Sequence, residues 1–379
     1  MKLRVALVTE SFLPSVNGVT NSVLKVLETL KSRGHEALVI APTREGPRHL
    51  GFPVVTCPFI SLGGFPVAIP TPAMTQVLDE FRPDVIHVAA PFWLGSQAIA
   101  YGNRRGIASV AVYQTDVSGY MERYGVPFAS GLIDAVTAST HKQATLNLAP
   151  TRASQDYLEG HGVPRVGLWG RGVDAELFNP RNRSTPEAMA LRARWAPGGE
   201  KIIGYVGRLA PEKQVKRLTE VCSIPGTQVV IVGDGPDRSD LERAFTGLNV
   251  TFAGRLTGTD LAEAYAVLDV FVHAGTEETF GQTIQEAHAS GVPVVAPHRG
   301  GPRYLVTSGV TGYLVDPTRP GAFREKVELL VGDPEARLRM SERARAGVEG
   351  KTWERNNQEL LAHYFEAIAM AGARHPLAA

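Results

Sequence analysis

Leu268-Asp-Val-Phe-Val-His-Ala274, followed after a short loop by Glu278-Thr-Phe-Gly-Gln-Thr-Ile-Gln-Glu286, is the stretch that decides the fold of this chain. The first run is apolar and predicts a buried strand. The residues from Thr283 predict a helix that ends before Gly291 and Pro293. A strand, a loop and a helix N-terminus suit an anionic ligand, because backbone N–H groups point out of the first turn and the helix dipole favours negative charge there.

Two carboxylates, Glu278 and Glu286, frame the start of this helix. A helix rises about 1.5 Å per residue, so the distance from Phe280 to Glu286 is roughly 9 Å. A sugar ring and a ribose are separated by about this much across a diphosphate. One carboxylate could hold the sugar hydroxyls while the other holds the ribose diol. The alternative interpretation is a helix with a polar N-terminus and one buried Glu.

The composition indicates a two-domain enzyme without a strong charge. With 379 residues the chain can form two domains, each with a sizeable core. Its formal net charge of +1 gives no broad electrostatic reason to expect nucleic acid as a partner. The two cysteines, Cys57 and Cys222, fall in different halves, so neither structural zinc nor a disulfide framework is expected.

The location of the protein is predicted from its apolar stretches. Residues 1–10 are too short and too soon polar for a signal peptide, and no stretch reaches transmembrane length without a charge, Pro or Gly, so we expect a cytoplasmic protein. The apolar run 59–70 is broken by Gly and Pro. It is either a loop packed against its domain, or an exposed rim that contacts a lipid-like acceptor or the inner face of the membrane.

Short β-branched runs alternate with helical stretches in both halves of the chain. The strands expected in the first half are residues 4–8, 36–40, 85–88 and 109–113. Those expected in the second half are residues 201–207, 228–232, 250–253, 270–273, 292–296 and 314–315. This alternation predicts α/β domains with a parallel, doubly wound sheet and helices on both faces.

A polar segment rich in Pro, residues 180–186, indicates the domain junction. We expect a first domain of residues 1–175 and a second of residues 176–352. Two doubly wound domains would face each other across a cleft, with ligands at the carboxyl ends of the strands.

Two cations follow the first expected strand of the second domain, in the segment Gly207-Arg-Leu-Ala-Pro-Glu-Lys213. The Arg208 fork suits phosphate oxygens, and Lys213 offers a compact point charge. Such a pair can stabilise a diphosphate as negative charge develops on a leaving group. The alternative is that both side chains are merely solvated.

Other glycine and histidine sites are read mainly as structural. Gly18 follows the first strand in an Asn-Gly turn, where it could let the backbone approach a ligand or simply form a βα turn. Gly233 and Gly235 lack the third glycine of a dinucleotide fingerprint, which argues against a nicotinamide-dependent dehydrogenase. His87 and His273 lie in apolar strands and are expected to be core residues. Neither G-x-S-x-G nor H-E-x-x-H is present.

These segments resemble the retaining glycosyltransferases of family 4. Glu278 and Glu286 match the E-x7-E motif of that family without a gap, and Arg208 and Lys213 match its phosphate-gripping pair. The resemblance extends over nearly the whole chain. It implies the GT-B fold of two Rossmann-like domains, and transfer of a sugar from a nucleotide donor to a hydroxyl with retention at the anomeric carbon.

The resemblance also implies the roles of domains and residues. Residues 1–175 would be the acceptor side, with a C-terminal helix in 353–379 crossing back onto them, and residues 176–352 would bind the donor. The implied catalytic residues are Arg208, Lys213 and Glu278. The implied nucleotide-sugar-binding residues are Gly18, Arg208, Lys213, Leu256, Glu278, Phe280, Gly281, Gln282, Thr283 and Glu286.

One segment departs from the family pattern. Many members place a His after a strand of the first domain, close to the sugar, where this chain has Gln114. Gln can hydrogen-bond a hydroxyl but cannot shuttle a proton. Gln114 and Asp116 are therefore expected on the acceptor side without a histidine-based role. Neither a cofactor nor a metal ion is expected, because no Asp-x-Asp element is placed to hold Mg²⁺ between the phosphates.

Within the family the chain is most similar to actinobacterial GDP-mannose-dependent α-mannosyltransferases that act on glycolipids. The segments Glu10-Ser-Phe-Leu-Pro14, Tyr113-Gln-Thr-Asp116 and Gly300-Gly-Pro-Arg303 carry this closer match. It implies GDP-mannose as donor and a lipid-linked or glycan acceptor. A UDP-sugar-dependent transferase, a GT-B epimerase and a two-domain sugar-binding protein remain as alternatives.

Overall fold

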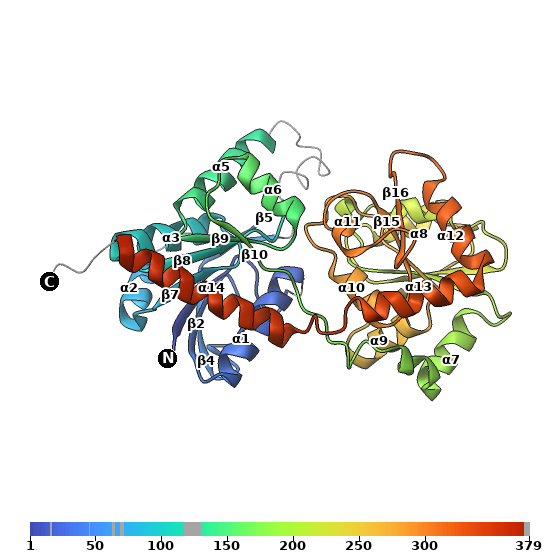
Figure 1. Ribbon diagram of the computed structural model, residues 1–379, viewed down its shortest axis with the longest axis horizontal. Helices are drawn as coiled ribbons and strands as arrows, with labels where there is room; N and C mark the ends of the chain where they lie inside the picture. Colours follow the sequence, from blue (N-terminus) through green and yellow to red (C-terminus); the bar gives the residue numbers. More distant parts are fainter. Residues whose placement is uncertain (16, 45, 63–64, 69–71, 117–129, 375–379) are drawn as a thin grey trace. The chain divides into compact units, whose positions relative to one another are not determined.

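The computed structural model describes residues 1–15, 17–44, 46–62, 65–68, 72–116 and 130–374 (Figure 1). Within this part the chain divides into two compact units. The first unit runs to Arg171 and resumes at Trp353, and the second is Gly172–Thr352. Each unit carries its own parallel sheet.

The junction lies earlier than the sequence predicts, between Arg171 and Gly172 rather than between residues 175 and 176. The physical reason is that the chain after Gly172 already packs on the second unit. The Arg345 guanidinium donates to the carbonyls of Ala175 and Phe178, at 3.0 Å each. The Pro-rich segment near residue 180 is therefore part of the second unit.

The first unit is built on an eight-stranded sheet. Its strands are β1 (Arg4–Val8), β2 (Glu36–Ala41), β3 (Arg48–His49), β4 (Phe52–Thr56), β7 (Val85–Val88), β8 (Ala108–Val112), β9 (Leu146–Ala149) and β10 (Val166–Leu168). Its helices are α1 (Gly18–Ser32), α2 (Pro72–Phe81), α3 (Trp93–Arg105), α5 (Ser130–Gln143), α6 (Arg152–Gly160) and α14 (Trp353–Arg374). The strand order is β10-β9-β8-β7-β1-β2-β4-β3, and only β3 and β4 pair antiparallel.

Both faces of this sheet are buried, as its apolar strands predict. In β1, Val5 and Leu7 point into one core with side chains of α1 and α14, whereas Ala6 and Val8 point into a second core with α2 and α3. Alternate residues of a strand point to opposite faces, so an unbroken apolar run requires a layer on each side. The sheet is doubly wound, as the sequence predicts.

The last helix, α14, returns to the first unit and lies along its sheet (Figure 1, red). The Tyr364 hydroxyl lies 2.8 Å from Nδ1 of the buried His87, and Trp169 Nε1 donates to the Asn356 carbonyl at 3.0 Å. Burial lowers the pKa of His87 to about 3, so the ring is neutral. His87 is a hydrogen-bonded core residue, as the sequence predicts.

The apolar run 59–70 contains a small antiparallel hairpin, β5 (Phe59–Leu62) and β6 (Phe65–Ala68). Residues 63–64 and 69–70 of the run lie outside the described part of the chain. Ile60 is half exposed, whereas Ala68 is buried against α2 and α3. The hairpin therefore combines one packed side chain with one that faces solvent.

The second unit is built on a six-stranded parallel sheet. Its strands are β11 (Lys201–Val206), β12 (Thr227–Val232), β13 (Val250–Gly254), β14 (Val270–Val272), β15 (Val294–Pro297) and β16 (Gly312–Val315). Its α-helices are α7 (Pro186–Trp195), α8 (Arg238–Ala244), α9 (Gly258–Ala266), α10 (Gln282–Ala289), α11 (Pro302–Leu305), α12 (Ala322–Gly332) and α13 (Pro334–Ala346). Three short 3-10 helices are η2 (Pro180–Ser184), η3 (Pro211–Lys213) and η4 (Val215–Glu220).

The second sheet has the strand order β13-β12-β11-β14-β15-β16, so the order reverses between β11 and β14. Ile202 packs with α9 and α10 on one face, and Ile203 packs with α8 and α12 on the other. Doubly wound sheets of this order bind ligands outside the carboxyl ends of the strands at the reversal. A ligand site is therefore expected at the loops after β11 and β14.

Candidate active site

The loops after β11 and β14 bring together two residues predicted from distant motifs. Lys213 Nζ lies 2.8 Å from Glu278 Oε2, and the two side chains are 21% and 19% exposed. Partial burial strengthens such a pair relative to one on the open surface, because solvent screens it less. The remaining exposure lets a ligand reach both groups. Lys213 and Glu278 thus form one charged patch at the switch point of the sheet.

Arg208 lies on the same loop as Lys213 but pairs elsewhere. Its Nη1 lies 3.8 Å from Oε1 of the buried Glu212, and its side chain is 40% exposed. The hydroxyl of Tyr205, in β11, donates to the Arg208 carbonyl at 3.1 Å and so anchors the loop to the strand. The guanidinium remains accessible to an anion at the end of β11.

Glycines let the loops of this edge lie in backbone contact. A Cβ at Gly233 would stand 1.9 Å from the Gly207 carbonyl oxygen, and one at Gly301 would stand 2.2 Å from the Phe280 carbonyl oxygen. The Gly301 amide also donates to the Glu278 carbonyl at 2.7 Å. Any side chain at these positions would push apart the loops that carry Arg208 and Glu278. These glycines shape the site without contributing a reactive group.

Helix α10 begins at Gln282, immediately after the loop that carries Glu278. Gly281 caps it with φ at 107°, a conformation that favours glycine. The first intrahelical bond is donated by Ile284 to the Gly281 carbonyl, so the Gln282 and Thr283 amides precede the helical ladder. Phe280 is buried beneath this turn. The structure therefore places a helix N-terminus next to the charged patch.

The Gln282 side chain is turned toward the start of the second unit. Its Nε2 donates to the Gly172 carbonyl at 3.1 Å. Leu256, which follows β13, is partly buried against the core that β11 and α10 share. Leu256 lies at the carboxyl edge of the sheet and Gln282 at the start of α10, and their role in nucleotide-sugar binding stays a prediction.

Glu286 lies inside α10, and Tyr265 of α9 holds it in place. The Tyr265 hydroxyl donates to Glu286 Oε2 at 2.9 Å, and the Tyr265 ring is fully buried. Burial raises the pKa of Glu286 to about 7, although the hydrogen bond from Tyr265 acts in the opposite direction. The carboxyl group is therefore protonated more readily than an ordinary glutamate, and the Tyr265 hydroxyl fixes its orientation.

The pKa of Glu286 predicts how stability changes with pH. A carboxyl group whose pKa is raised by folding stabilises the fold at low pH, and this contribution is lost as the pH rises through about 7. Gln does not ionise. The melting temperature of Glu286→Gln minus that of the wild type is expected to be larger at pH 8 than at pH 5. Thermal unfolding of both proteins at the two pH values measures this difference, and an equal difference at both would contradict the raised pKa.

The first unit has its own polar cluster at the end of its sheet. The Arg171 Nη2 donates to Gln114 Oε1 at 3.0 Å, and Gln114 Nε2 donates to the Ala89 carbonyl at 2.9 Å. A Cβ at Gly18 would stand 2.7 Å from Arg171 Nη1. Gly18, Gln114 and Arg171 therefore meet in one place, although they come from distant parts of the sequence.

Arg171 was not predicted as a site residue. It is the last residue of the first unit before the chain enters the second, nine positions ahead of the Pro-rich segment that the sequence indicates as the junction. In the Asn-Gly turn, Asn17 is the N-cap of α1: its Oδ1 accepts from the Val19 and Thr20 amides at 3.0 Å each. Asp116 is partly buried at the limit of the described residues. Burial raises the pKa of Tyr113, and the charge of Asp116 acts in the same direction.

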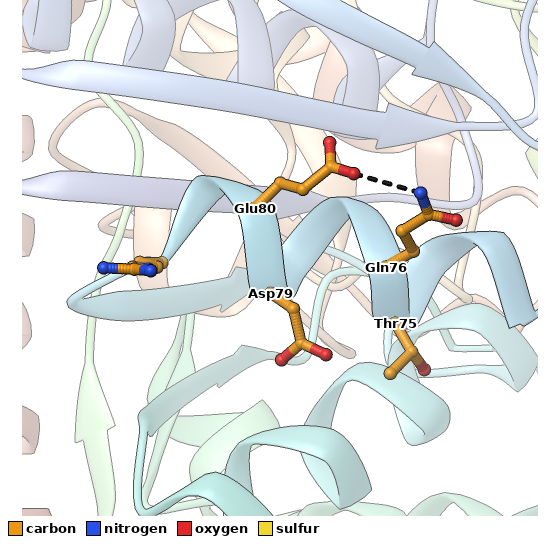
Figure 2. A pocket seen from close by; sticks show the side chains of 5 residues that line it. Thr75, Gln76, Asp79 and Glu80 are labelled. Carbon is orange, nitrogen blue, oxygen red and sulfur yellow. Dashed lines mark hydrogen bonds between the residues drawn. The ribbon is translucent and has the colours of Figure 1, made fainter.

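Two hollows in the described part of the chain lie away from the Lys213–Glu278 pair. One is an open surface depression along α2, lined by Thr75, Gln76, Asp79, Glu80 and Arg82 (Figure 2). Its polar side chains bond to neighbours, as Gln76 does to Glu80 at 3.0 Å. The other is a small, partly open hollow of about 10 Å³ beside Gln114, with room for about one water molecule. Neither contains the Lys213–Glu278 pair.

The described part of the chain holds neither a cluster of metal ligands nor a membrane-spanning helix. Among its described residues there is no group of three or more His, Cys, Asp or Glu side chains that could hold a metal ion. In that same part no helix combines the length and the apolar character needed to cross a membrane. His273 at the end of β14 is buried, which lowers its pKa to about 4 and keeps it neutral.

Solved structures share the fold. HepE of Anabaena in complex with UDP-glucose has a TM-score of 0.78 and 21% identity over 96% of this chain and 100% of that chain. Sucrose-phosphate synthase of Thermosynechococcus elongatus has a TM-score of 0.79 and 20% identity over 97% and 100%. The two Rossmann-like units therefore form the GT-B fold, as the sequence predicts.

The family is shown by sequence relatives. A family model described as Glycosyltransferase Family 4 matches residues 16–177, and one described as Glycosyl transferases group 1 matches residues 190–347. A GDP-mannose-dependent alpha-mannosyltransferase of Mycobacterium tuberculosis is 45% identical over 97% of both chains. A protein with the same name in Corynebacterium glutamicum is 43% identical over 97% of this chain and 90% of that one. The chain belongs to the family 4 glycosyltransferases, and it is an enzyme of that family.

Proposed function

We propose that this enzyme transfers a mannosyl group from GDP-mannose to a hydroxyl of a glycolipid or glycan, with retention at the anomeric carbon. The donor is inferred from relatives that are 43–45% identical over nearly the full length and carry GDP-mannose in their names. The observation that carries the reaction type is the Lys213–Glu278 pair beside the N-terminus of α10.

The charges of this patch suit a nucleoside diphosphate leaving group. Lys213 and Arg208 would contact the phosphates, and the first amides of α10 would add partial positive charge. Each of these groups is in place before the reaction, so none needs to reorganise as negative charge develops on the departing oxygen. Such preorganised stabilisation lowers the barrier for cleavage of the sugar–phosphate bond.

The two carboxylates would have different roles. Glu278 lies against Lys213 at the loop end of the motif, where it can hold sugar hydroxyls next to the diphosphate. Glu286 is oriented by Tyr265 within α10, where it can accept from the ribose diol. Contacts to the ribose change little during the reaction and would mainly set donor affinity.

The cluster in the first unit would serve the acceptor side. Gln114 offers an amide and Arg171 a guanidinium near the start of α1, where the missing side chain of Gly18 leaves room for that guanidinium. Neither group can move a proton at neutral pH. We infer that this cluster binds and orients, while proton removal from the acceptor hydroxyl is left to the donor phosphate.

An apolar acceptor would fit exposed side chains of the first unit. Leu132 and Val136 lie on one face of α5, four positions apart, and are 70% and 54% exposed. Large exposed apolar side chains on one face favour contact with lipid. We infer that the enzyme acts in the cytoplasm and meets its glycolipid acceptor at the inner face of the membrane.

Thermal unfolding with GDP, UDP and ADP tests the donor. A nucleotide that binds only the folded state raises the melting temperature according to its affinity. GDP is expected to raise it most at equal concentration. A larger shift with UDP would replace GDP-mannose by a UDP-sugar. Stabilisation by free mannose alone would instead favour a sugar-binding protein without transferase activity.

Transfer is expected to need no metal ion. Arg208, Lys213 and the α10 amides already supply positive charge at the proposed diphosphate site. The rate of donor consumption should therefore be the same in EDTA as in buffer with added Mg²⁺. Activity that disappears in EDTA and returns with Mg²⁺ or Mn²⁺ would contradict this prediction.

A further inference from the structure

Gln214 occupies an uncommon backbone position directly after Lys213. It joins η3 to η4 with φ at 50° and ψ at 35°, in the left-handed region that residues other than glycine rarely adopt. A strained conformation persists where surrounding contacts hold it, and it is frequent at functional sites. The contacts of the Gln214 side chain show what holds this turn.

The Gln214 amide bridges the two loops of the active site. Its Nε2 donates to Thr276 Oγ1 at 2.5 Å and to Glu277 Oε2 at 2.7 Å. The Thr276 hydroxyl in turn donates to the other carboxylate oxygen of Glu277 at 2.6 Å. Arg217 Nε donates to Gln214 Oε1 at 2.8 Å, which fixes the orientation of the amide. Thr276 and Glu277 are both buried.

This bridge lies next to the charged pair along both loops. Gln214 follows Lys213, and Glu277 precedes Glu278, so the two interactions connect the same loops one residue apart. Gly275 brings the backbones together, since a Cβ there would stand 3.1 Å from the Glu212 carbonyl oxygen. Thr276 and Glu277 are buried and Gln214 is partly buried, whereas the side chains of Lys213 and Glu278 are 21% and 19% exposed.

We propose that Gln214 is a positioning residue for sugar transfer: its bridge to Thr276 and Glu277 holds Lys213 and Glu278 at the spacing from which both contact the donor. The inference rests on the proposed roles of that pair. A lysine ammonium on a four-carbon stem does not fix its own position. A displacement of about 1 Å in a group that stabilises the transition state can cost about 10²-fold in rate.

The variant Gln214→Gly separates the bridge from the backbone turn. Glycine adopts φ of 50° without strain, so the turn is kept while the amide is lost. We expect kcat for transfer to fall about 10- to 100-fold, with the donor KM little changed. A folded Gln214→Gly variant with wild-type kcat would overturn the proposal.

A second variant removes one of the two acceptors of the bridge from the opposite loop. Thr276→Val deletes the hydroxyl that accepts from Gln214, while Glu277 Oε2 still accepts from the same amide, and it leaves the backbone of the turn untouched. It is expected to lower kcat by a smaller factor than Gln214→Gly, and a kcat equal to that of the wild type would count against the proposal. Arg82→Gly is the matched control, because Arg82 is another non-glycine residue in the left-handed region, with φ at 47°, on the first unit. Its kcat is expected to match the wild type, and a loss equal to that of Gln214→Gly would count against the bridge.

A double variant tests whether Gln214 acts through Lys213. In a Lys213→Ala background, Gln214→Gly should cost much less than it does alone, because the group it positions is already gone. A full additional loss would overturn the proposal. If the wild type consumes no nucleotide sugar, the proposed function fails and this role fails with it. If the wild type does consume donor, the variants bear on Gln214 alone.

Discussion

Lys213→Ala is expected to lower kcat for sugar transfer by about 10²–10³-fold, the loss seen when one preorganised electrostatic group is removed from a transition state. The reason is its position: the ammonium lies 2.8 Å from Glu278 Oε2 at the switch point of the second sheet. Its effect on the acceptor KM should be small. Steady-state rates at varied donor and acceptor concentrations measure both.

Lys216→Ala is the matched control for this change. Lys216 is exposed on η4, three positions beyond Lys213, so its substitution by Ala removes the same charge from the same region. It should retain wild-type kcat. If Lys213→Ala consumed donor at the native rate, the assignment of Lys213 to the leaving group would be wrong.

Gly18→Trp is expected to reduce transfer by about 10²-fold or more while nucleotide binding is retained. A Cβ at Gly18 already comes within 2.7 Å of Arg171 Nη1, so an indole must displace the guanidinium from Gln114. The cluster proposed for the acceptor would then be blocked. The second unit, with Lys213 and α10, is unchanged by the substitution. Thermal shift with GDP and the transfer rate measure the two effects separately.

Gly160→Trp controls for the bulk of the indole. Gly160 ends α6 in the same unit, and no atom lies within 4 Å of a Cβ placed there. This variant should transfer sugar like the wild type. Loss of the GDP-induced shift in Gly18→Trp would mean that the nucleotide depends on the first unit, contrary to the site proposed for it.

The sequence predicts the elements of this fold well because its signals are local. The strand β11 follows from an apolar run, and the helix that begins near Thr283 follows from its pattern and from Gly291 and Pro293 at its end; neither needs knowledge of distant residues. Glu278 and Lys213 were also predicted, since each stands in a short motif at the end of a strand. Their 2.8 Å contact depends on the order of the strands in the sheet.

Contacts between distant segments could not be predicted in this way. Arg171 donates to Gln114, which lies 57 positions earlier in the chain. The bridge from Gln214 to Glu277 joins two loops whose sequences carry no common pattern. Side-chain pairing of this kind depends on how the loops pack. The sequence shows a glycine at position 275, but only the structure shows how closely the two loops approach there.

Incubation of the purified enzyme with GDP-[¹⁴C]mannose and a glycolipid extract tests the central claim most directly. The account predicts that label moves from the nucleotide to the lipid-extractable fraction as GDP is released, and that labelled UDP-glucose under the same conditions is left intact. Release or transfer of label from UDP-glucose but not from GDP-mannose would contradict the proposed donor. If neither nucleotide sugar were consumed, the proposed reaction itself would be contradicted.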